Sequence, residues 1–236
     1  MKIGCIGCGN MGGGVLKGLV PHGEYELFGH DHTRAKVEAL DAEGHRVAWA
    51  ESPRALAEAA DVIILAVKPY QMEAMLEEIR PALDGSKTVL SLAAAVSQEK
   101  LMQGVAGLCP VVRTMPNLPV IVGKGVFALC FDDPSLSEAR KAELLALFQK
   151  LGMAVVLPER LFPAFTSLVG CGPASSSSSW KVCSMPVSPW GSRLPIPANS
   201  SPPWWKARRS WPLRAARALP TFASRSAPRR ARPYAA

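Results

Sequence analysis

A glycine-rich turn directly after an apolar strand constrains this sequence more than any other feature. Residues 2–6 (KIGCI) predict a short buried strand, and Gly7, Gly9 and Gly12 follow it in a G-x-G-x-x-G pattern. In a dinucleotide-binding turn the first glycine permits the tight turn, the second lets the backbone approach a pyrophosphate, and the third lets the helix pack close to the strand. A helix-compatible run over residues 13–20 completes the strand–turn–helix context that the motif requires. The pattern therefore favours a dinucleotide site over the alternative, a structural turn that binds nothing.

Apolar runs typical of strands alternate with helical patterns through the first two thirds of the chain. The clearest run, residues 61–67 (DVIILAV), is continuously apolar, as expected of a parallel strand that is covered on both faces. Further strands are expected at 24–31, 47–50, 88–92, 111–113, 125–131 and 154–157, and helices at 35–43, from 53 onward, at 70–79 and at 136–151. This alternation predicts an α/β fold, a Rossmann-type doubly wound and mostly parallel sheet.

The end of the second expected strand carries conflicting signals for cofactor preference. Asp31 lies about 20 residues after the glycine turn, where a carboxylate would bond the ribose 2′-hydroxyl of NAD. His32, Thr33, Arg34 and Lys36 follow at once, and such a basic cluster suits the 2′-phosphate of NADP. A third interpretation is a strand-end acid that only starts the next helix, with Thr33 as its cap. The residues leave the choice between NADH and NADPH open.

The six cysteines show no disulfide framework. Cys5 and Cys8 form a C-x-x-C pair, but it straddles the strand and the glycine turn and has no second half, so buried reduced thiols are expected rather than a metal site. We find no N-terminal secretion signal and no apolar run of transmembrane length. Together these features predict a cytoplasmic protein without a metal.

Charge divides the chain near residue 174. Residues 1–174 contain 16 Lys and Arg and all 19 Asp and Glu, whereas residues 175–236 contain 11 Lys and Arg and no acid. The second segment also holds five of the six Trp and ten of the 21 Pro, without helical or strand periodicity, which predicts a disordered basic tail. Such a segment attracts polyanions, and a nucleic-acid role through phosphates and stacking is one alternative. Because it carries no nucleic-acid-binding motif, we expect no specific nucleic-acid partner and no membrane.

Four motifs in register resemble those of the pyrroline-5-carboxylate reductase family. They are IGCGNMGGGVLKGL, ILAVKPYQM, VVRTMPNLPVIVGKGV and TSLVGCGPA, and the resemblance covers residues 1–174. It implies an oxidoreductase of proline biosynthesis that transfers hydride from NAD(P)H to the C=N of 1-pyrroline-5-carboxylate, giving L-proline. It also implies a homo-oligomer built through a C-terminal helical domain. An NAD(P)-binding module without turnover is the alternative, and a polyanion-binding protein is a third.

The resemblance and the motif spacing nominate site residues. Those expected to hold the cofactor are Gly7, Gly9, Asn10, Met11, Gly12, Asp31, His32, Thr33, Arg34, Ala66, Val67, Lys68 and Pro69. Those expected near the substrate and the nicotinamide are Met115, Pro116 and Asn117. Five positions depart from the family pattern: Ala95 for Gly, Leu118 for Thr, Lys124 for Glu, Pro163 for Asp and Val169 for Ser. No acid–base pair is demanded, so no catalytic residue is nominated.

The expected boundaries are residues 1–160 for the NAD(P)-binding Rossmann domain, 161–174 for the start of the helical substrate and dimerisation domain, and 175–236 for the tail. The family continues from G-P-A into that helical domain and later supplies an S-P-G-G-T-T substrate loop. If the codon of Ser179 ends in A, sliding the reading frame by one base turns Ser-Trp-Lys into Met-Glu, and synonymous codons for residues 180–188 then permit MEGLFDAGV. The same slide permits VCSPAGATIRG from residues 225–235, similar to the missing loop. We therefore expect a single-base loss near Ala174, with the helical domain replaced by a frameshifted tail.

Overall fold

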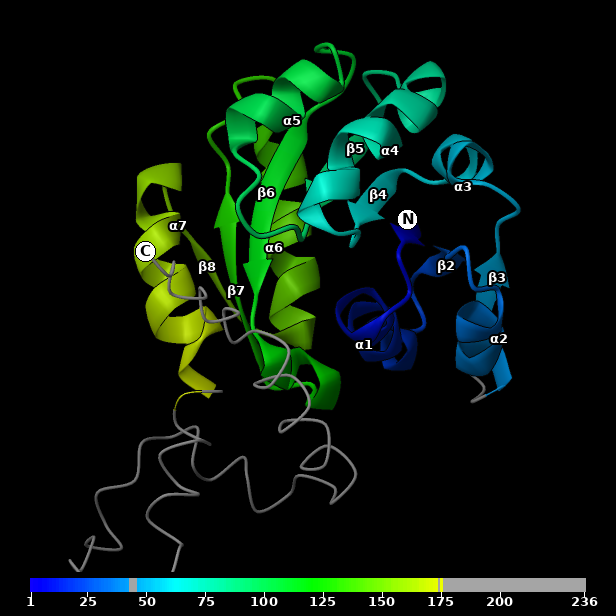
Figure 1. Ribbon diagram of the computed structural model, residues 1–236, viewed down its shortest axis with the longest axis horizontal. Helices are drawn as coiled ribbons and strands as arrows, with labels where there is room; N and C mark the ends of the chain where they lie inside the picture. The colour runs from blue at the N-terminus through cyan, green and yellow to red at the C-terminus, as the bar shows by residue number, and fades with distance from the viewer. Residues whose placement is uncertain (43–45, 174, 176–236) are drawn as a thin grey trace, which may run out of the picture. The chain divides into compact units, whose positions relative to one another are not determined.

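The computed structural model describes residues 1–42, 46–173 and 175 (Figure 1). Residues Met1–Cys171 form one compact unit around an eight-stranded sheet of order β3-β2-β1-β4-β5-β6-β7-β8. The strands are β1 (Lys2–Ile6), β2 (Glu26–His30), β3 (Val47–Trp49), β4 (Val62–Leu65), β5 (Thr88–Ser91), β6 (Val111–Pro116), β7 (Gly125–Cys130) and β8 (Gly152–Val156). The helices are α1 (Asn10–Leu19), α2 (Ala35–Ala42), α3 (Pro53–Ala59), α4 (Met72–Ile79), α5 (Gln98–Gly104), α6 (Glu138–Leu151) and α7 (Phe162–Phe165). Except for Ser175, the expected tail lies outside the described residues.

The sheet is mostly parallel, as the alternation predicted. Strands β1 to β6 pair in parallel, β7 runs antiparallel to β6, and β8 is again parallel to β7. The chain leaves β1 in one direction to reach β2 and β3, and returns to the other side of β1 for β4. Because strand order reverses between β1 and β4, their carboxyl ends open a crevice, which is where doubly wound sheets bind ligands.

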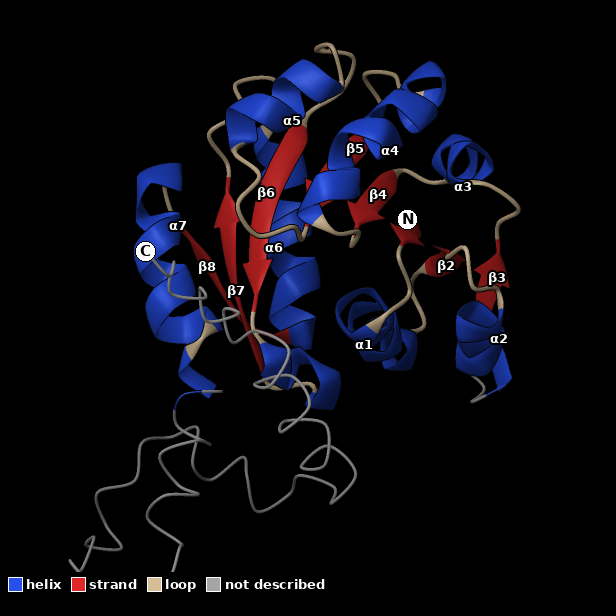
Figure 2. Cartoon of the chain, viewed as in Figure 1, coloured by secondary structure: helices blue, strands red, loops and turns tan. Residues whose placement is uncertain are grey.

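Helices cover both faces of the sheet (Figure 2). Helices α1, α2 and α6 pack on one face, in a core that includes Leu16, Leu40 and Leu147. Helices α3, α4 and α5 cover the other face. Within β4, Ile64 belongs to the first core and Ile63 to the second, since successive side chains of a strand point to opposite faces. Burial on both faces explains why β4 reads as an unbroken apolar run.

Serine caps start three of the helices. The Ser52 hydroxyl accepts from the Ala55 N–H at 3.1 Å, with Pro53 in the first turn as the sequence predicted. Ser97 and Ser137 accept in the same way from Lys100 and Arg140. Helix α5, which Ser97 caps, was not predicted, and that cap is its clearest local signal.

The last described elements form a small apolar cluster against the antiparallel end of the sheet. Phe162 and Phe165 of α7 are buried with Ala128 and Cys130 of β7. A π-helical turn over Thr166–Gly170 follows, and its Leu168 side chain is 77% exposed. None of the helices in the described ranges is long and apolar enough to cross a membrane.

Candidate functional site

The glycine turn lies at the carboxyl end of β1, beside the backbone that leaves β4. Gly7 has φ of 96°, and a Cβ there would come within 2.8 Å of the Ala66 carbonyl oxygen. A Cβ on Gly12 would collide with the Gly7 carbonyl oxygen and lie 2.7 Å from Cys5 Sγ. These two glycines are therefore required by the protein's own packing, one for the turn and one for the approach of α1.

Gly9 differs from its two neighbours in the motif. A Cβ built on Gly9 meets no protein atom within 4 Å, so the space outside it is open. Gly9 caps α1 in an extended conformation, and its carbonyl accepts from the Gly13 N–H at 2.8 Å. The N–H groups that open α1 lack helical partners and carry the positive end of the helix dipole. Gly9 and Asn10 are exposed, whereas the Met11 side chain packs partly on the core. This corner offers a backbone cradle for an anion.

Asp31 follows β2 directly and ties the glycine turn to the next loop. One carboxylate oxygen accepts from the Cys8 N–H at 3.1 Å, and the other accepts from the Thr33 N–H at 2.9 Å. The Lys36 ammonium lies 3.0 Å from both oxygens. Burial opposes ionisation of Asp31, but the Thr33 N–H and the Lys36 charge outweigh it and lower the pKa of this carboxyl. These bonds engage Asp31 with both the glycine turn and the loop that leads to α2.

Arg34 and His32 lie on the outer surface beside that carboxylate. Their side chains are 65% and 86% exposed. The Arg34 guanidinium lies 5.5 Å from the ring centre of Trp49 and pairs with Glu38 through Nε at 2.7 Å. A nearby open groove of about 640 Å³ between α2 and β3 is lined by Arg34 and Trp49 but by no glycine-turn residue. The groove therefore adjoins the site without being its centre.

Residues 66–69 form the loop that leaves β4 at the same edge. Ala66 donates its N–H to the Ile6 carbonyl at 2.8 Å, which holds this loop against β1. Pro69 opens a 3₁₀ turn, and the Lys68 N–H donates to Gln71 Oε1 at 3.1 Å. Ala66 and Val67 are partly buried, whereas Lys68, Pro69 and Tyr70 are exposed. The structure thus brings this loop beside Gly7.

Met115 and Pro116 end β6, and Asn117 follows at the same carboxyl edge of the parallel strands. The Asn117 side chain is buried, accepting from the Val126 N–H at 2.9 Å and donating to the Val169 carbonyl at 3.5 Å. Its amide is thus engaged with β7 and with the π-helical turn. The 3₁₀ turn that follows, Leu118–Val122, packs on α1, with Ile121 3.6 Å from a Cβ built on Gly14. Asn117 therefore holds the β6 end in place.

Arg113 supplies a link that the sequence did not suggest. Its guanidinium pairs with Glu159 at 2.7 Å and lies 4.8 Å from the ring centre of Phe162. Gln98, also missed, is 3% exposed and bridges the Val111 carbonyl and the Arg113 N–H. These bonds fasten the start of α7 to β6. Arg113 belongs to the motif VVRTMPNLPVIVGKGV, but no feature of the sequence pairs it with Glu159.

Among the residues that the structure describes, no three His, Cys, Asp or Glu side chains are grouped as metal ligands. Cys5 and Cys8 are buried free thiols, with Cys8 Sγ 3.6 Å from the Cys5 carbonyl oxygen. The Cys5 thiol has a raised pKa because of its contact with Cys8 and its burial.

Comparison with known proteins gives consistent matches. Residues 2–95 match the family model described as NADP oxidoreductase coenzyme F420-dependent. The pyrroline-5-carboxylate reductases of Aquifex aeolicus and Escherichia coli are 34% and 32% identical over 175 and 176 residues, covering 74% and 73% of this chain. Over these residues the chain belongs to the pyrroline-5-carboxylate reductase family. The match spans 64% and 65% of those two relatives, so the chain accounts for just under two thirds of their length.

A solved member of the family has the same fold. The crystal structure of Plasmodium falciparum pyrroline carboxylate reductase with NADP bound superposes with a TM-score of 0.67 at 26% identity, covering 78% of this chain and 67% of that one. An imine reductase from Streptomyces aurantiacus shares the fold at a TM-score of 0.62, with 18% identity and coverage of 78% and 65%. The Rossmann-type unit is thus common to both groups.

Proposed function

We propose that residues 1–160 are the cofactor-binding domain of a cytoplasmic reductase of the pyrroline-5-carboxylate type, that residues 161–174 begin its helical substrate domain, and that the cofactor is NADPH or NADH. The observation that carries the proposal is the assembly at one sheet edge: the Gly9 opening and the start of α1, the 66–69 loop, and the β6 end. Family membership supports the same reaction, hydride transfer to the C=N carbon of 1-pyrroline-5-carboxylate to give L-proline. The cofactor supplies the hydride, and the protein binds the cofactor and orients it against the C=N carbon.

The residues divide this work between them. The backbone at Gly9, Asn10 and Met11 would hold the pyrophosphate at the positive end of α1. The 66–69 loop would form the wall beside it. Asn117, whose amide is engaged with β7 and the π-helical turn, would keep Met115 and Pro116 in register beside the nicotinamide rather than act on the substrate itself.

A cofactor-binding unit without turnover is the second candidate, because residues 175–236 lack the S-P-G-G-T-T loop on which the family's substrate binding depends. We propose that a single-base loss near Ala174 produced this tail, and that the frame-restored chain is the homo-oligomeric reductase. Resequencing the DNA across the codons of Leu168 to Lys181 tests this directly. An extra base there supports the proposal, and an unchanged reading refutes it.

The activity test compares the present chain with a frame-restored chain. We expect both to bind NADPH, measured by calorimetry, and only the restored chain to oxidise it in the presence of 1-pyrroline-5-carboxylate. Turnover by the present chain would reject the second candidate. Binding of neither nicotinamide cofactor to either chain would reject the dinucleotide site itself.

A further inference from the structure

Three side chains form a row along one face of β6 and the residue that follows it. Arg113, Met115 and Asn117 are spaced two residues apart, and alternate residues of a strand point to the same side. Arg113 and Met115 are paired across β7 with Cys130 and Ala128, and both of these are buried against α7. The row therefore faces the segment that begins the proposed helical domain.

Each member of this row contacts the segment 159–170. Arg113 lies 4.8 Å from the ring centre of Phe162, Met115 Cε lies 3.1 Å from a Cβ built on Gly170, and the Asn117 amide donates to the Val169 carbonyl at 3.5 Å. The strand advances about 13 Å from Arg113 to Asn117, and a helical chain advances about 10 Å from Phe162 to Val169. The segment therefore runs alongside the strand for nearly its own length.

The contact at Arg113 is the firmest of the three. Glu159 Oε1 accepts from Arg113 Nη1 and from the Gln98 N–H, both at 2.7 Å. The Gln98 side chain in turn bridges the Val111 carbonyl and the Arg113 N–H. The Arg113 and Glu159 side chains are 13% and 30% exposed, and a charge-assisted bond that is shielded in this way holds better than an exposed ion pair.

We infer that Arg113 is a positioning residue: it fixes the first turns of the helical domain on β6, and so sets where that domain meets the β6 end. This inference rests on the proposed function and goes beyond it, because it names the residue that aligns the two domains. Arg113 does not act on the substrate itself, since its guanidinium is engaged by Glu159 and covered by Phe162.

Loss of this anchor should be felt at the substrate edge rather than at the cofactor turn. The Asn117–Val169 bond is long at 3.5 Å, and the contact of Met115 is only a van der Waals contact, so neither should hold the segment by itself. The Val169 carbonyl should then leave Asn117. Strands β4 and β5 separate β6 from β1, so the glycine turn should stay in place and NADPH affinity should change by less than twofold.

The first test measures amide hydrogen exchange of the full present chain by mass spectrometry. The reporters are the N–H groups of Thr166 and Cys171, which donate to the carbonyls of Phe162 and Thr166. Arg113→Met keeps a side chain of similar length against Phe162 and removes the charge. We expect exchange over residues 162–171 to become at least tenfold faster, with exchange in β1 and α1 unchanged. Unchanged exchange over residues 162–171, or exchange raised equally throughout the sheet, would overturn the inference.

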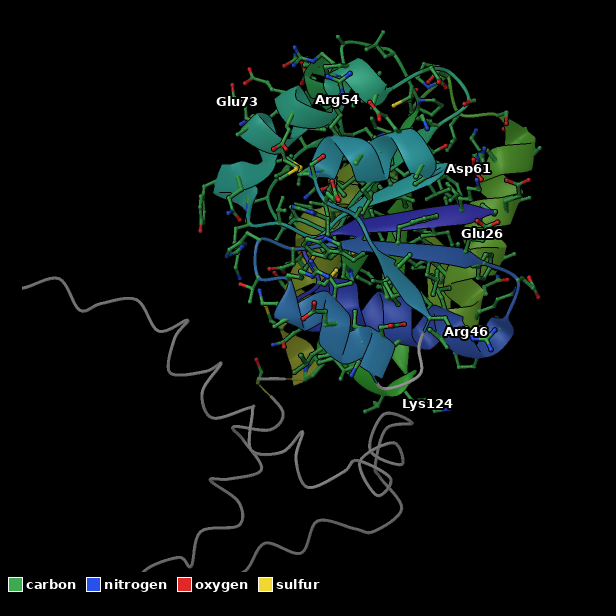
Figure 3. All side chains as sticks on the ribbon, turned by 90° about the vertical axis from the view of Figure 1, so that its right-hand side faces the viewer. Glu26, Arg46, Arg54, Asp61, Glu73 and Lys124 are labelled. Atoms are coloured by element: carbon green, nitrogen blue, oxygen red, sulfur yellow. The ribbon has the colours of Figure 1, made fainter. Side chains whose placement is uncertain are left out.

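Arg140→Met is the matched control. Arg140 pairs with Glu143 at 3.0 Å, and its side chain is 23% exposed. It belongs to α6, which packs on the face of the sheet opposite α7. With Asp61 it lines a groove at the amino ends of the strands, and Figure 3 shows Asp61 and Glu26 at this end. Equal acceleration of residues 162–171 by this control would overturn the assignment to Arg113.

A double variant tests whether Arg113 acts through Glu159. Glu159→Gln removes the charge and keeps the size of the side chain, so it should speed exchange of the same segment. The chain that carries both Arg113→Met and Glu159→Gln should exchange no faster than the faster single variant. Effects that multiply would show that the two residues act independently, which would refute the pair as the anchor.

The frame-restored chain tests the consequence for the reaction. Arg113→Met should lower kcat/KM for 1-pyrroline-5-carboxylate at least tenfold and leave the KM for NADPH within twofold, a split that general destabilisation would not produce. An unchanged kcat/KM for the imine would overturn the positioning role. Absence of turnover in the restored parent chain would instead reject the proposed function, and the exchange experiment would still decide whether Arg113 holds the segment.

Discussion

Alanine at Gly12 should destabilise the fold, whereas alanine at Gly9 should weaken cofactor binding and leave the fold intact. A Cβ on Gly12 collides with the backbone oxygen of Gly7 and lies 2.7 Å from Cys5 Sγ, so α1 must shift away from β1. Overpacking of this kind costs about 2–3 kcal/mol, and the better helix propensity of alanine returns about 1 kcal/mol. The net loss of about 1–2 kcal/mol corresponds to a fall in Tm of about 2–8 °C.

Alanine at Gly9 should have the opposite effect, with little change in stability and a loss of cofactor affinity. Its φ of −76° and ψ of −157° suit alanine, and the added Cβ meets no protein atom within 4 Å. The entropy gain of about 0.4–1 kcal/mol from stiffening the unfolded chain is offset by a poorer helix cap, so Tm should move by less than about 2 °C. The methyl group would stand where a pyrophosphate approaches, and we expect at least a tenfold loss in NADPH affinity, about 1.4 kcal/mol.

The assay pairs thermal unfolding by circular dichroism with calorimetric titration of NADPH. Gly85→Ala is the control, because its Cβ also meets no atom within 4 Å but the residue lies in the loop before β5, at the opposite edge of the sheet. It should change neither quantity. A Gly9→Ala chain that binds NADPH like the parent would refute the placement of the pyrophosphate, and a Gly12→Ala chain of unchanged Tm would refute the packing argument.

Three further predictions follow from the described residues. Ala95 has φ of 64°, a conformation that costs a non-glycine residue about 1–2 kcal/mol, so Ala95→Gly should raise the free energy of unfolding by about 0.5–1 kcal/mol. The control, Ala94→Gly, should lower it, and an Ala95→Gly chain that is destabilised in urea unfolding would count against this prediction. Burial raises the pKa of the Cys109 thiol to about 12, so alkylation of the native chain at pH 8 should modify the exposed Cys171 and spare Cys109. Peptide mass spectrometry measures this, and alkylation of Cys109 as early as Cys171 would contradict it. Leu168 is an exposed apolar side chain on a segment that would begin the helical domain, so the present chain should aggregate and Leu168→Ser should reduce the aggregated fraction in size-exclusion chromatography; a sharp monomer peak from the parent chain would contradict this.

Sequence periodicity was sufficient for most of the fold. Strand β4 was recognised because burial on both faces demands an uninterrupted apolar run, and Ser52-Pro53 marked the start of α3 through the chemistry of the cap. Helix α5 was missed since its seven residues show too little periodicity to stand out. Strand β6 extends three residues beyond the predicted end at Arg113, because its pairing with β7 continues through Pro116.

The family resemblance also marked a strained position from the sequence alone. Ala95 stands where the family has glycine, and its positive φ shows the physical reason for that glycine. The bonding partners of the nominated side chains could not be predicted from the sequence. Asn117 belongs to the motif VVRTMPNLPVIVGKGV. Its side-chain amide nevertheless bonds the backbone of Val126 and Val169, which are 9 and 52 residues away along the chain.

By itself, the sequence determined the α/β class, the dinucleotide-type turn and the residues that could form a cofactor site, because hydrophobic period and glycine spacing are local properties of the chain. Only the tertiary structure decided which donors the Asp31 carboxylate bonds. Its residue type fits a ribose ligand, but the fold places the Cys8 N–H, 23 positions earlier, and the Lys36 ammonium within 3.1 Å of its oxygens. A carboxylate has few lone pairs, and which donors claim them depends on which chain segments the fold brings together.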